Sequence, residues 1–183
     1  MLYTRKGDDG TTKTFGCDQR ISKSSAMAEA LGSLDETNSY LGLCKVAAGK
    51  SKFKLCDKKF SDIVQGVQEN LFIVQAEVAG AKKTISAEKI TEIETFIDAA
   101  EKELPPIKTF FISGGTELAA LFDVARTISR RAERRVVFVR DEGMVKISKD
   151  TASYLNRLSS LLYALARLTN HKSEIKEKAP SYE

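Results

Sequence analysis

The chain has 183 residues, of which 42% are hydrophobic and 30% are charged. A chain of this length buries one sizeable core, so we expect a single domain over residues 1–183. The formal net charge of +4 is small because acidic residues nearly match basic ones, and this balance argues against a general polyanion binder such as a nucleic-acid-binding protein.

The three cysteines, Cys17, Cys44 and Cys56, show no CxxC spacing, and His171 is the only histidine. This pattern argues against a structural zinc site or a disulfide framework and favours reduced thiols. The N-terminus has no apolar segment typical of a secretory signal, and no run approaches the roughly 20 apolar residues that span a bilayer. We therefore expect a soluble, cytoplasmic protein without a membrane partner.

The N-terminal stretch "YTRKGDDGTTKTFG", residues 3–16, is rich in Gly, Thr, Asp and basic residues and has no apolar periodicity. Two interpretations are open: a disordered tail, or a loop that holds phosphate groups. It is not a P-loop, because it lacks the GK[ST] ending and does not follow a strand.

Five later segments carry apolar residues at alternating steps of three and four, which predicts amphipathic helices. These helices are expected over 24–48, 55–80, 86–104, 116–140 and 148–170. In the second, one apolar face contains Phe60, Ile63, Val67, Leu71, Val74 and Val78. Pro105 and Pro106 end the third helix, and Thr116 caps the fourth. "KTFFIS" and "RRVVFVR" have some strand character, but the second continues a helical pattern. The sequence predicts an all-α, up-and-down bundle.

Arginines form a stripe on the predicted fourth helix, in "ARTISRRAERR". Arg126, Arg130 and Arg134 are spaced by four, and Glu133 lies three residues after Arg130, so all four share one helix face. The stripe is either a solvated surface with a few ion pairs or a site for an external anion or a facing carboxylate. A nucleic-acid-binding helix is a weaker interpretation, because aromatic interleaving is missing.

Polar residues also lie beside two apolar faces. Asp35, Asn38 and Gly42 follow one edge of the first helix, where a half-buried carboxylate needs a partner such as one of the arginines. Asn156 lies beside Leu155 in the last helix, at the rim of the core. A satisfied interhelical hydrogen bond is the structural interpretation of that amide.

These pieces occur together and in order: "YTRKGDDGTT…FG…RISK", "LGSLDETNSYLG", "FFISGGT", "ARTISRRAERRVV" and "YLNRLSSLLYALAR". Together they resemble the PduO-type ATP:cob(I)alamin adenosyltransferases over nearly the whole chain. The resemblance implies a ferritin-like five-helix bundle assembled as a homotrimer, with ATP and a corrinoid bound between subunits. It divides the chain into a nucleotide-binding segment (1–23), a helical bundle (24–172) and a polar tail (173–183).

The resemblance also implies which residues hold ATP. The set comprises Thr4, Arg5, Lys6, Gly7, Thr12, Lys13 and Lys23 from the N-terminal segment, Arg130, Arg131, Glu133 and Arg134 from the fourth helix, and Asn156 from the last. The glycines, hydroxyls and cations of the N-terminal segment suit a triphosphate. Mg²⁺ is expected to bind through phosphate oxygens, without a dedicated protein metal site.

Asp35, Arg126, Phe110 and Arg130 are the expected catalytic residues. By resemblance, Asp35 and Arg126 pair across a subunit interface near the corrinoid. The same resemblance implies that Phe110 is the aromatic residue that displaces the axial donor of cobalt, although it or Phe111 could instead close the end of the bundle. The chain reads ISGG where many members read LPGG. The spacing in "FGCDQRISK" is also unusual, which affects the register of Lys23 and leaves Cys17 unassigned.

The implied reaction transfers the 5′-deoxyadenosyl group of ATP to Co(I) of a corrinoid, giving adenosylcobalamin and triphosphate. Because Co(I) is the nucleophile, the protein needs no catalytic triad and no His-based site. A corrinoid reductase or an adenosylcobalamin-dependent enzyme is a further expected partner. The alternatives are a catalytically silent ATP-binding regulator on the same bundle and a purely structural interaction protein.

Overall fold

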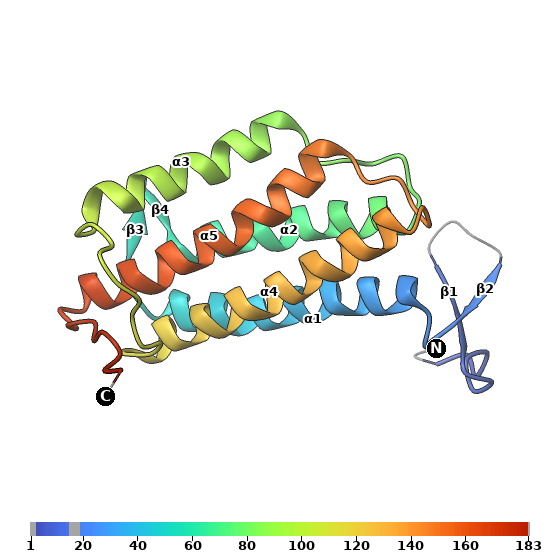
Figure 1. The fold of residues 1–183 in the computed structure, drawn as a ribbon, viewed down its shortest axis with the longest axis horizontal. Coiled ribbons are helices and arrows are strands. Elements are labelled where there is room, and N and C mark those ends of the chain that lie inside the picture. The colour runs from blue at the N-terminus through green and yellow to red at the C-terminus, as the bar shows by residue number, and fades with distance from the viewer. Residues whose placement is uncertain (1–2, 15–18, 183) are drawn as a thin grey trace.

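The computed structural model describes residues 3–14 and 19–182, and within them the chain forms a five-helix bundle (Figure 1). The helices are α1 (Ala26–Gly49), α2 (Phe60–Val78), α3 (Ala87–Glu103), α4 (Glu117–Asp141) and α5 (Lys149–Lys172). The predicted all-α bundle is confirmed, and "RRVVFVR" lies within α4. None of the helices in the described part of the chain is long and apolar enough to cross a membrane.

Two short antiparallel hairpins accompany the helices. One pairs β1 (Thr11–Lys13) with β2 (Arg20–Ser22), and the other pairs β3 (Lys54–Leu55) with β4 (Lys58–Lys59). The segment "KTFFIS", whose sequence has some strand character, has no regular secondary structure over residues 108–113. The predicted start of the second helix at residue 55 is also wrong, because Cys56 and Asp57 adopt positive φ and turn the chain back before Phe60.

Helix starts follow from capping residues. The hydroxyls of Ser25, Thr116 and Ser148 each accept a hydrogen bond from the backbone N–H three residues later, at 3.1–3.2 Å. Such a cap satisfies one of the backbone donors that a helix leaves unpaired at its N-terminus. The capping role predicted for Thr116 is confirmed, and it fixes where the α3–α4 loop ends and α4 begins.

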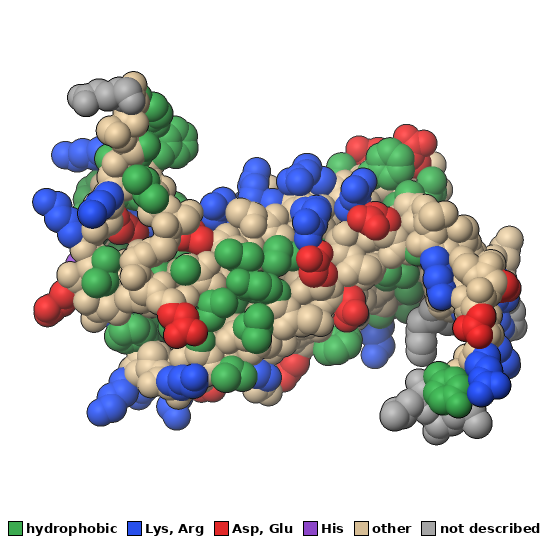
Figure 2. All heavy atoms as spheres, turned by 90° about the horizontal axis from the view of Figure 1, so that it is seen from below, with side chains coloured by type: hydrophobic (Ala, Val, Ile, Leu, Met, Phe, Trp, Pro, Cys, Tyr) green, Lys and Arg blue, Asp and Glu red, His purple; other side chains and the backbone are tan. Residues whose placement is uncertain are grey.

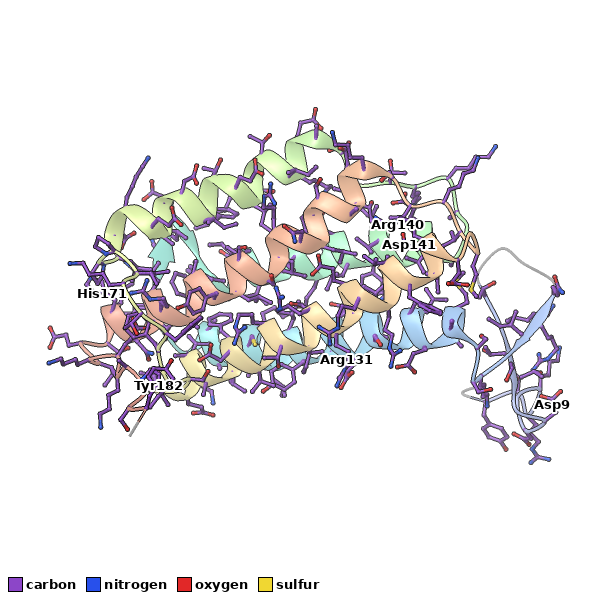
Figure 3. All side chains as sticks on the ribbon, viewed as in Figure 1. Asp9, Arg131, Arg140, Asp141, His171 and Tyr182 are labelled. Atoms are coloured by element: carbon purple, nitrogen blue, oxygen red, sulfur yellow. The ribbon has the colours of Figure 1, made fainter. Side chains whose placement is uncertain are left out.

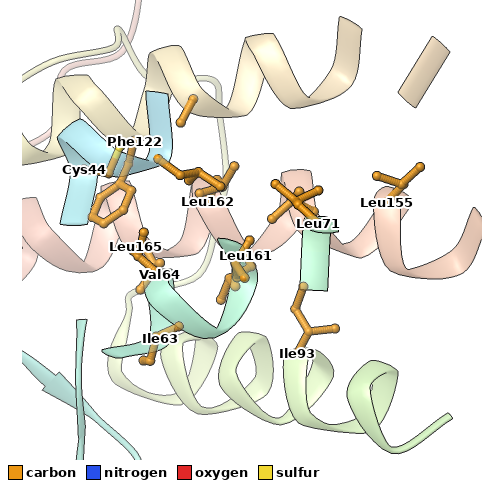
Figure 4. Close-up of a cluster of buried hydrophobic side chains, with 14 of the residues drawn as sticks. Cys44, Ile63, Val64, Leu71, Ile93, Phe122, Leu155, Leu161, Leu162 and Leu165 are labelled. Carbon is orange, nitrogen blue, oxygen red and sulfur yellow. The ribbon is translucent and has the colours of Figure 1, made fainter. Parts of the chain in front are cut away.

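The core lies between helices that are neighbours in space. α5 packs against α3 and α4, and α1 packs against α4 and α2. The predicted face of α2 is confirmed, since all six of its apolar residues are buried. Figure 4 shows part of this cluster, with Phe122 of α4 near Leu162 and Leu165 of α5. Burying a Leu or Phe side chain contributes roughly 1.5–3 kcal/mol, so this interface holds α4 and α5 in fixed register.

Candidate functional site

A cavity of about 550 Å³ lies between the α3–α4 loop, α4 and α5. Phe110 and Phe111 of the loop line it, together with Arg126 and Arg130 of α4 and Tyr163 of α5. The structure thus brings together three of the four predicted catalytic residues. The cavity combines apolar rings with guanidinium groups, which suits a large ligand that has both apolar and anionic parts.

Phe110 is 79% exposed, although its side chain is a large apolar ring. A role in closing the end of the bundle is therefore excluded for Phe110 within this chain. Phe111 is partly buried, and the guanidinium carbon of Arg167 lies 4.8 Å from the centre of its ring, which is a cation–π contact.

Arg126 points into the cavity beside two groups from its own chain. Its Nε lies 3.8 Å from Asp123 Oδ1, one helical turn earlier, and its guanidinium carbon lies 5.8 Å from the ring centre of Tyr163. Burial raises the pKa of Tyr163, so its hydroxyl is protonated at neutral pH. Asp123 and Tyr163 were missed by sequence reasoning. The i, i+3 spacing of Asp123 and Arg126 was the available signal.

Arg130 and Arg134 continue along α4. Arg130 Nη1 donates to Ser159 Oγ at 3.5 Å, and Arg134 Nη1 donates to the Arg130 carbonyl at 3.1 Å. Within the described residues, neither guanidinium forms an ion pair with a carboxylate. Two uncompensated cations on one face favour an anionic ligand over the interpretation of a surface covered with ion pairs.

The other predicted nucleotide contacts of α4 and α5 lie nearby. Asn156 Nδ2 donates to Glu133 Oε1 at 3.2 Å, so the expected interhelical hydrogen bond is present. Arg131 instead forms an ion pair with Glu36 of α1, and its label in Figure 3 marks this lower side of α4. The α4 residues thus face two directions: Arg130 toward α5 and the cavity, and Arg131 toward α1.

The N-terminal segment forms a hairpin and several hydrogen bonds, which its composition did not predict. Besides the β1–β2 hairpin, Lys23 Nζ donates to the Gly7 carbonyl at 2.8 Å, and the Lys23 N–H donates to the Gly10 carbonyl at 2.9 Å. A Cβ on Gly7 would lie 3.1 Å from Lys23 Nζ, so a small residue is favoured there. Phe15, Gly16 and Cys17 lie outside the described residues, so the unusual spacing at Cys17 stays unassigned.

Arg20 and Asp9 hold this segment together, and sequence reasoning singled out neither. Arg20 Nε donates to Thr11 Oγ1 at 2.5 Å, and its Nη2 donates to the carbonyls of Thr11 and Lys6. Hydrogen bonds from the Thr11 hydroxyl and backbone N–H lower the pKa of Asp9. Thr4, Arg5, Thr12 and Lys13, also predicted to contact ATP, belong to this same turn and hairpin.

Within one chain the predicted site is divided. The β1–β2 hairpin lies at one end of the bundle, whereas the α3–α4 loop lies at the other (Figure 1). Asp35 is exposed on α1, so the prediction of a half-buried carboxylate is wrong for the isolated chain. It lines a separate depression of about 370 Å³ with Asn38 and Phe72, and not the cavity that contains Arg126.

The C-terminal segment was predicted only as a polar tail, but it contacts α5 and the α3–α4 loop. Glu177 pairs with Arg167 at 3.0 Å, and the Ile112 N–H donates to the Lys178 carbonyl at 2.9 Å.

Figure 2 shows exposed hydrophobic side chains in the middle of the face seen from below, next to a row of Lys and Arg. The exposed apolar residues of α1 and α4 include Leu43, Val46 and Val124.

A helical bundle with an arginine-lined cavity and an exposed aromatic loop is the arrangement of a protein that binds an anionic ligand beside a large apolar one. Residues 2–169 match the family model described as cobalamin adenosyltransferase. The chain therefore belongs to the cobalamin adenosyltransferase family, as the sequence resemblance predicted.

Relatives and solved structures agree with this assignment. The chain is 38% identical over 177 residues to the corrinoid adenosyltransferase PduO of Citrobacter freundii, covering 93% of this chain and 50% of that protein. It is 36% identical to the corrinoid adenosyltransferase of Bacillus subtilis (strain 168), covering 95% of this chain and 89% of that one. The chain thus spans about half the length of the PduO relatives and most of the Bacillus protein.

Among solved structures, the fold matches a variant PduO-type ATP:corrinoid adenosyltransferase from Lactobacillus reuteri complexed with cobalamin and ATP. The TM-score is 0.87 at 29% sequence identity, covering 98% of this chain and 99% of that one. A second variant of that protein, complexed with ATP, matches with a TM-score of 0.86. The similarity extends over the whole bundle.

Proposed function

We propose that this chain transfers the 5′-deoxyadenosyl group of ATP to Co(I) of a corrinoid, forming adenosylcobalamin and releasing triphosphate. The observation that carries the proposal is the cavity in which exposed Phe110 faces the same space as Arg126 and Arg130. The relatives are named corrinoid adenosyltransferases, and a similar solved structure is complexed with cobalamin and ATP. Because those relatives are named as enzymes, a silent regulator is not favoured.

The arginines of α4 would stabilise the leaving group. As the bond between the 5′-carbon and oxygen breaks, negative charge grows on the triphosphate. Arg130 and Arg134, whose guanidinium groups pair with no carboxylate of the described residues, would stabilise that charge. Glu133 and Asn156, already joined by a hydrogen bond, would hold the nucleotide beside them. The protein thus supplies alignment and charge stabilisation, while the corrinoid supplies the nucleophile.

Magnesium would enter as MgATP. In the described part of the chain, no cluster of three or more His, Cys, Asp or Glu side chains is placed to hold a metal ion. Mg²⁺ keeps several water ligands and binds readily to phosphate oxygens, so we expect the triphosphate to supply most of its other ligands. The N-terminal cations Lys6, Lys13 and Lys23 would balance the remaining phosphate charge.

The active form is proposed to be a closed homotrimer with its sites between subunits. A single chain leaves Asp35 remote from the cavity of Arg126, and it leaves the β1–β2 hairpin at the far end of the bundle. A neighbouring chain would bring its Asp35 to Arg126 and its N-terminal segment to α4, and the exposed apolar residues of α1 and α4 would be buried. We also propose a cytoplasmic location and, as a partner, a reductase that supplies the reduced corrinoid.

An anaerobic assay tests the function directly. The purified chain is mixed with MgATP and chemically reduced cobalamin, and the corrinoid absorption is followed as the cobalt–carbon bond forms. Conversion that depends on both ATP and protein supports the proposal, and triphosphate should appear in equal amount. ATP binding without any conversion would favour the silent regulator.

A further inference from the structure

An exposed aromatic ring in an irregular loop keeps a fixed position only if other groups hold the loop, and Phe110 is such a ring. Phe110 lies in a segment without regular secondary structure, and its side chain is 79% exposed. Its own contacts are therefore too few to offset the entropy of ordering it. A ring that must exclude an axial ligand from cobalt has to stay in one place, so its neighbours must supply the order.

The peptide groups at Gly114 are held from two helices. The Gly114 N–H donates to Asp123 Oδ2 of α4 at 3.2 Å, and the Gly114 carbonyl accepts from Asn170 Nδ2 of α5 at 2.8 Å. Asn170 Oδ1 also accepts from the Thr116 N–H at 3.1 Å. Asp123 and Asn170 are 9% and 5% exposed, so both anchors are fixed in the packed bundle.

The two glycines are required by this arrangement. Gly114 and Gly115 have φ of 116° and 105°, a region that favours glycine. A Cβ on Gly115 would lie 2.4 Å from Asn170 Oδ1, well inside contact distance. The backbone can therefore lie against Asn170 only because this position has no side chain. The amide of Asn170 therefore explains Gly115, whereas Gly114 is favoured by its positive φ alone, because a Cβ there would meet no atom within 4 Å.

Asp123 connects this loop to the cationic side of the cavity. One of its carboxylate oxygens accepts from Gly114, and the other lies 3.8 Å from Arg126 Nε. The same side chain thus contacts both the Phe110 loop and the arginine expected to meet Asp35 of a second chain. A shift of Asp123 would move both walls of the cavity together.

We propose that Asp123 and Asn170 are positioning residues, which hold Gly114 and thereby keep Phe110 at a fixed place in the cavity wall. The proposal rests on the proposed function for the meaning of that place, but the ordering itself is a property of the free protein. Neither residue is expected to touch the reacting atoms. Both bind the loop at Gly114, four residues after Phe110, and affect the ring through the loop backbone.

A fluorescent probe tests the ordering without any ligand. The chain contains no tryptophan, so F110W introduces a single indole at the position in question. Time-resolved anisotropy then reports how freely that indole moves on the nanosecond timescale. We expect N170A and D123A, each in the F110W chain, to raise the amplitude of the fast decay by at least about twofold. An unchanged amplitude in both would overturn the proposal.

Asn70 supplies the matched control. It is 6% exposed and bridges other elements through a hydrogen bond from its Nδ2 to Tyr154 at 3.1 Å, remote from the α3–α4 loop. N70A should lower the melting temperature as N170A does, yet leave the anisotropy decay unchanged. An equal increase in N70A would show that general loosening, and not the anchoring of Gly114, controls the ring.

A second variant leaves the buried side chains intact. G115A places a methyl group against Asn170 from an exposed loop position, so the bundle should fold even if N170A does not. In the F110W chain it should also raise the fast amplitude. A folded G115A with the parent's decay would contradict the proposal.

Activity then separates this proposal from the proposed function. The measured quantity is the rate with Co(II) corrinoid plus reductant, divided by the rate with Co(I) corrinoid. N170A should lower this ratio, and it should lower it no further in an F110A chain, because residues that act through one ring are not additive. Additive effects would contradict the proposal. If the parent chain converts no corrinoid at all, the proposed function fails, while the anisotropy result still decides the positioning role.

Discussion

Arg126 Nε lies 3.8 Å from Asp123 Oδ1, a distance longer than a charge-assisted hydrogen bond, and this buried Nε has no hydrogen-bond partner among the described residues. A buried N–H without a hydrogen-bond acceptor is costly, so a second carboxylate should complete the site. Within the described chain Asp35 does not reach it. The geometry therefore favours a partner from another copy.

The first prediction is a trimer in solution. Light scattering at micromolar concentration should give three times the chain mass of 20.2 kDa. D35A and R126A should each weaken assembly or activity, and the double variant should be little worse than either single one, because the two remove the same contact. A monomer mass for the parent protein would refute both the trimer and the shared site.

The second prediction concerns Arg130. R130A removes a guanidinium that has no carboxylate partner in the described chain, and a charge-assisted contact to phosphate contributes about 1.5–3 kcal/mol. Turnover should therefore fall at least about tenfold with the fold intact. R140A is the matched control, because Arg140 lies near the C-terminal end of the same helix and pairs with adjacent Asp141 (Figure 3). Normal activity in R130A would show that the arginine stripe is a solvated surface and not a phosphate site.

The third prediction concerns the N-terminal segment. Trypsin cleavage after Arg5, Lys6 and Lys13 should slow sharply in MgATP, because contacts with the phosphates would add to the hydrogen bonds of this polar segment and make its local opening rarer. The β1–β2 hairpin lies beyond the end of the bundle and is connected to it at the start of α1 (Figure 1). Cleavage after Lys172, beyond the segment, serves as the internal control. Equal rates with and without nucleotide would contradict a nucleotide-binding role.

The fourth prediction uses Cys44. Burial raises the pKa of its thiol to about 12, whereas Cys56 is exposed. In a C17S chain at pH 8, a thiol reagent should label Cys56 quickly and Cys44 only as fast as the protein unfolds. Because the pKa of Cys44 in the folded protein is above its unfolded value, the buried neutral thiol contributes its full stability below about pH 9. That contribution to the free energy of unfolding is lost as the pH rises toward 12. Rapid labelling of both thiols under native conditions would contradict the burial.

The helices were predictable because their periodicity is strong and extends over many residues. The hairpins were not, since strands of two or three residues carry no alternating pattern that a sequence can show. The β3–β4 turn places Cys56 and Asp57 at positive φ without a glycine, so the usual turn signal is missing. The capping residue Thr116 was predicted because its signal is local.

The site was predictable in type more than in arrangement. The resemblance pointed to Phe110, Arg126 and Arg130, which do line one cavity. Asp123 and Asn170 were missed because their roles depend on a contact with Gly114 across two helices, and no short motif encodes that contact. The exposure of Asp35 was mispredicted because a helix-edge position does not tell whether the covering surface comes from the same chain.

The last prediction concerns Phe110. Co(II) in cobalamin usually carries an axial nitrogen donor, which raises the energy of the orbital that accepts the electron, so removing that donor eases reduction to Co(I). An apolar ring that occupies the donor's space and excludes water can do this. F110A should therefore lose most activity when the corrinoid is supplied as Co(II) with a reductant, and much less when it is supplied as Co(I).

Stability separates this role from packing. A core Phe→Ala change costs about 3–5 kcal/mol, but a ring that is 79% exposed makes few contacts, so F110A should lower the free energy of unfolding far less. F122A is the contrasting variant, because Phe122 is fully buried on α4 and should show the full cost. Denaturant unfolding measures both variants, and calorimetry should show nearly normal ATP binding for F110A. If F110A is as unstable as F122A, or equally impaired with both oxidation states, Phe110 is a packing residue and another group must exclude the axial donor.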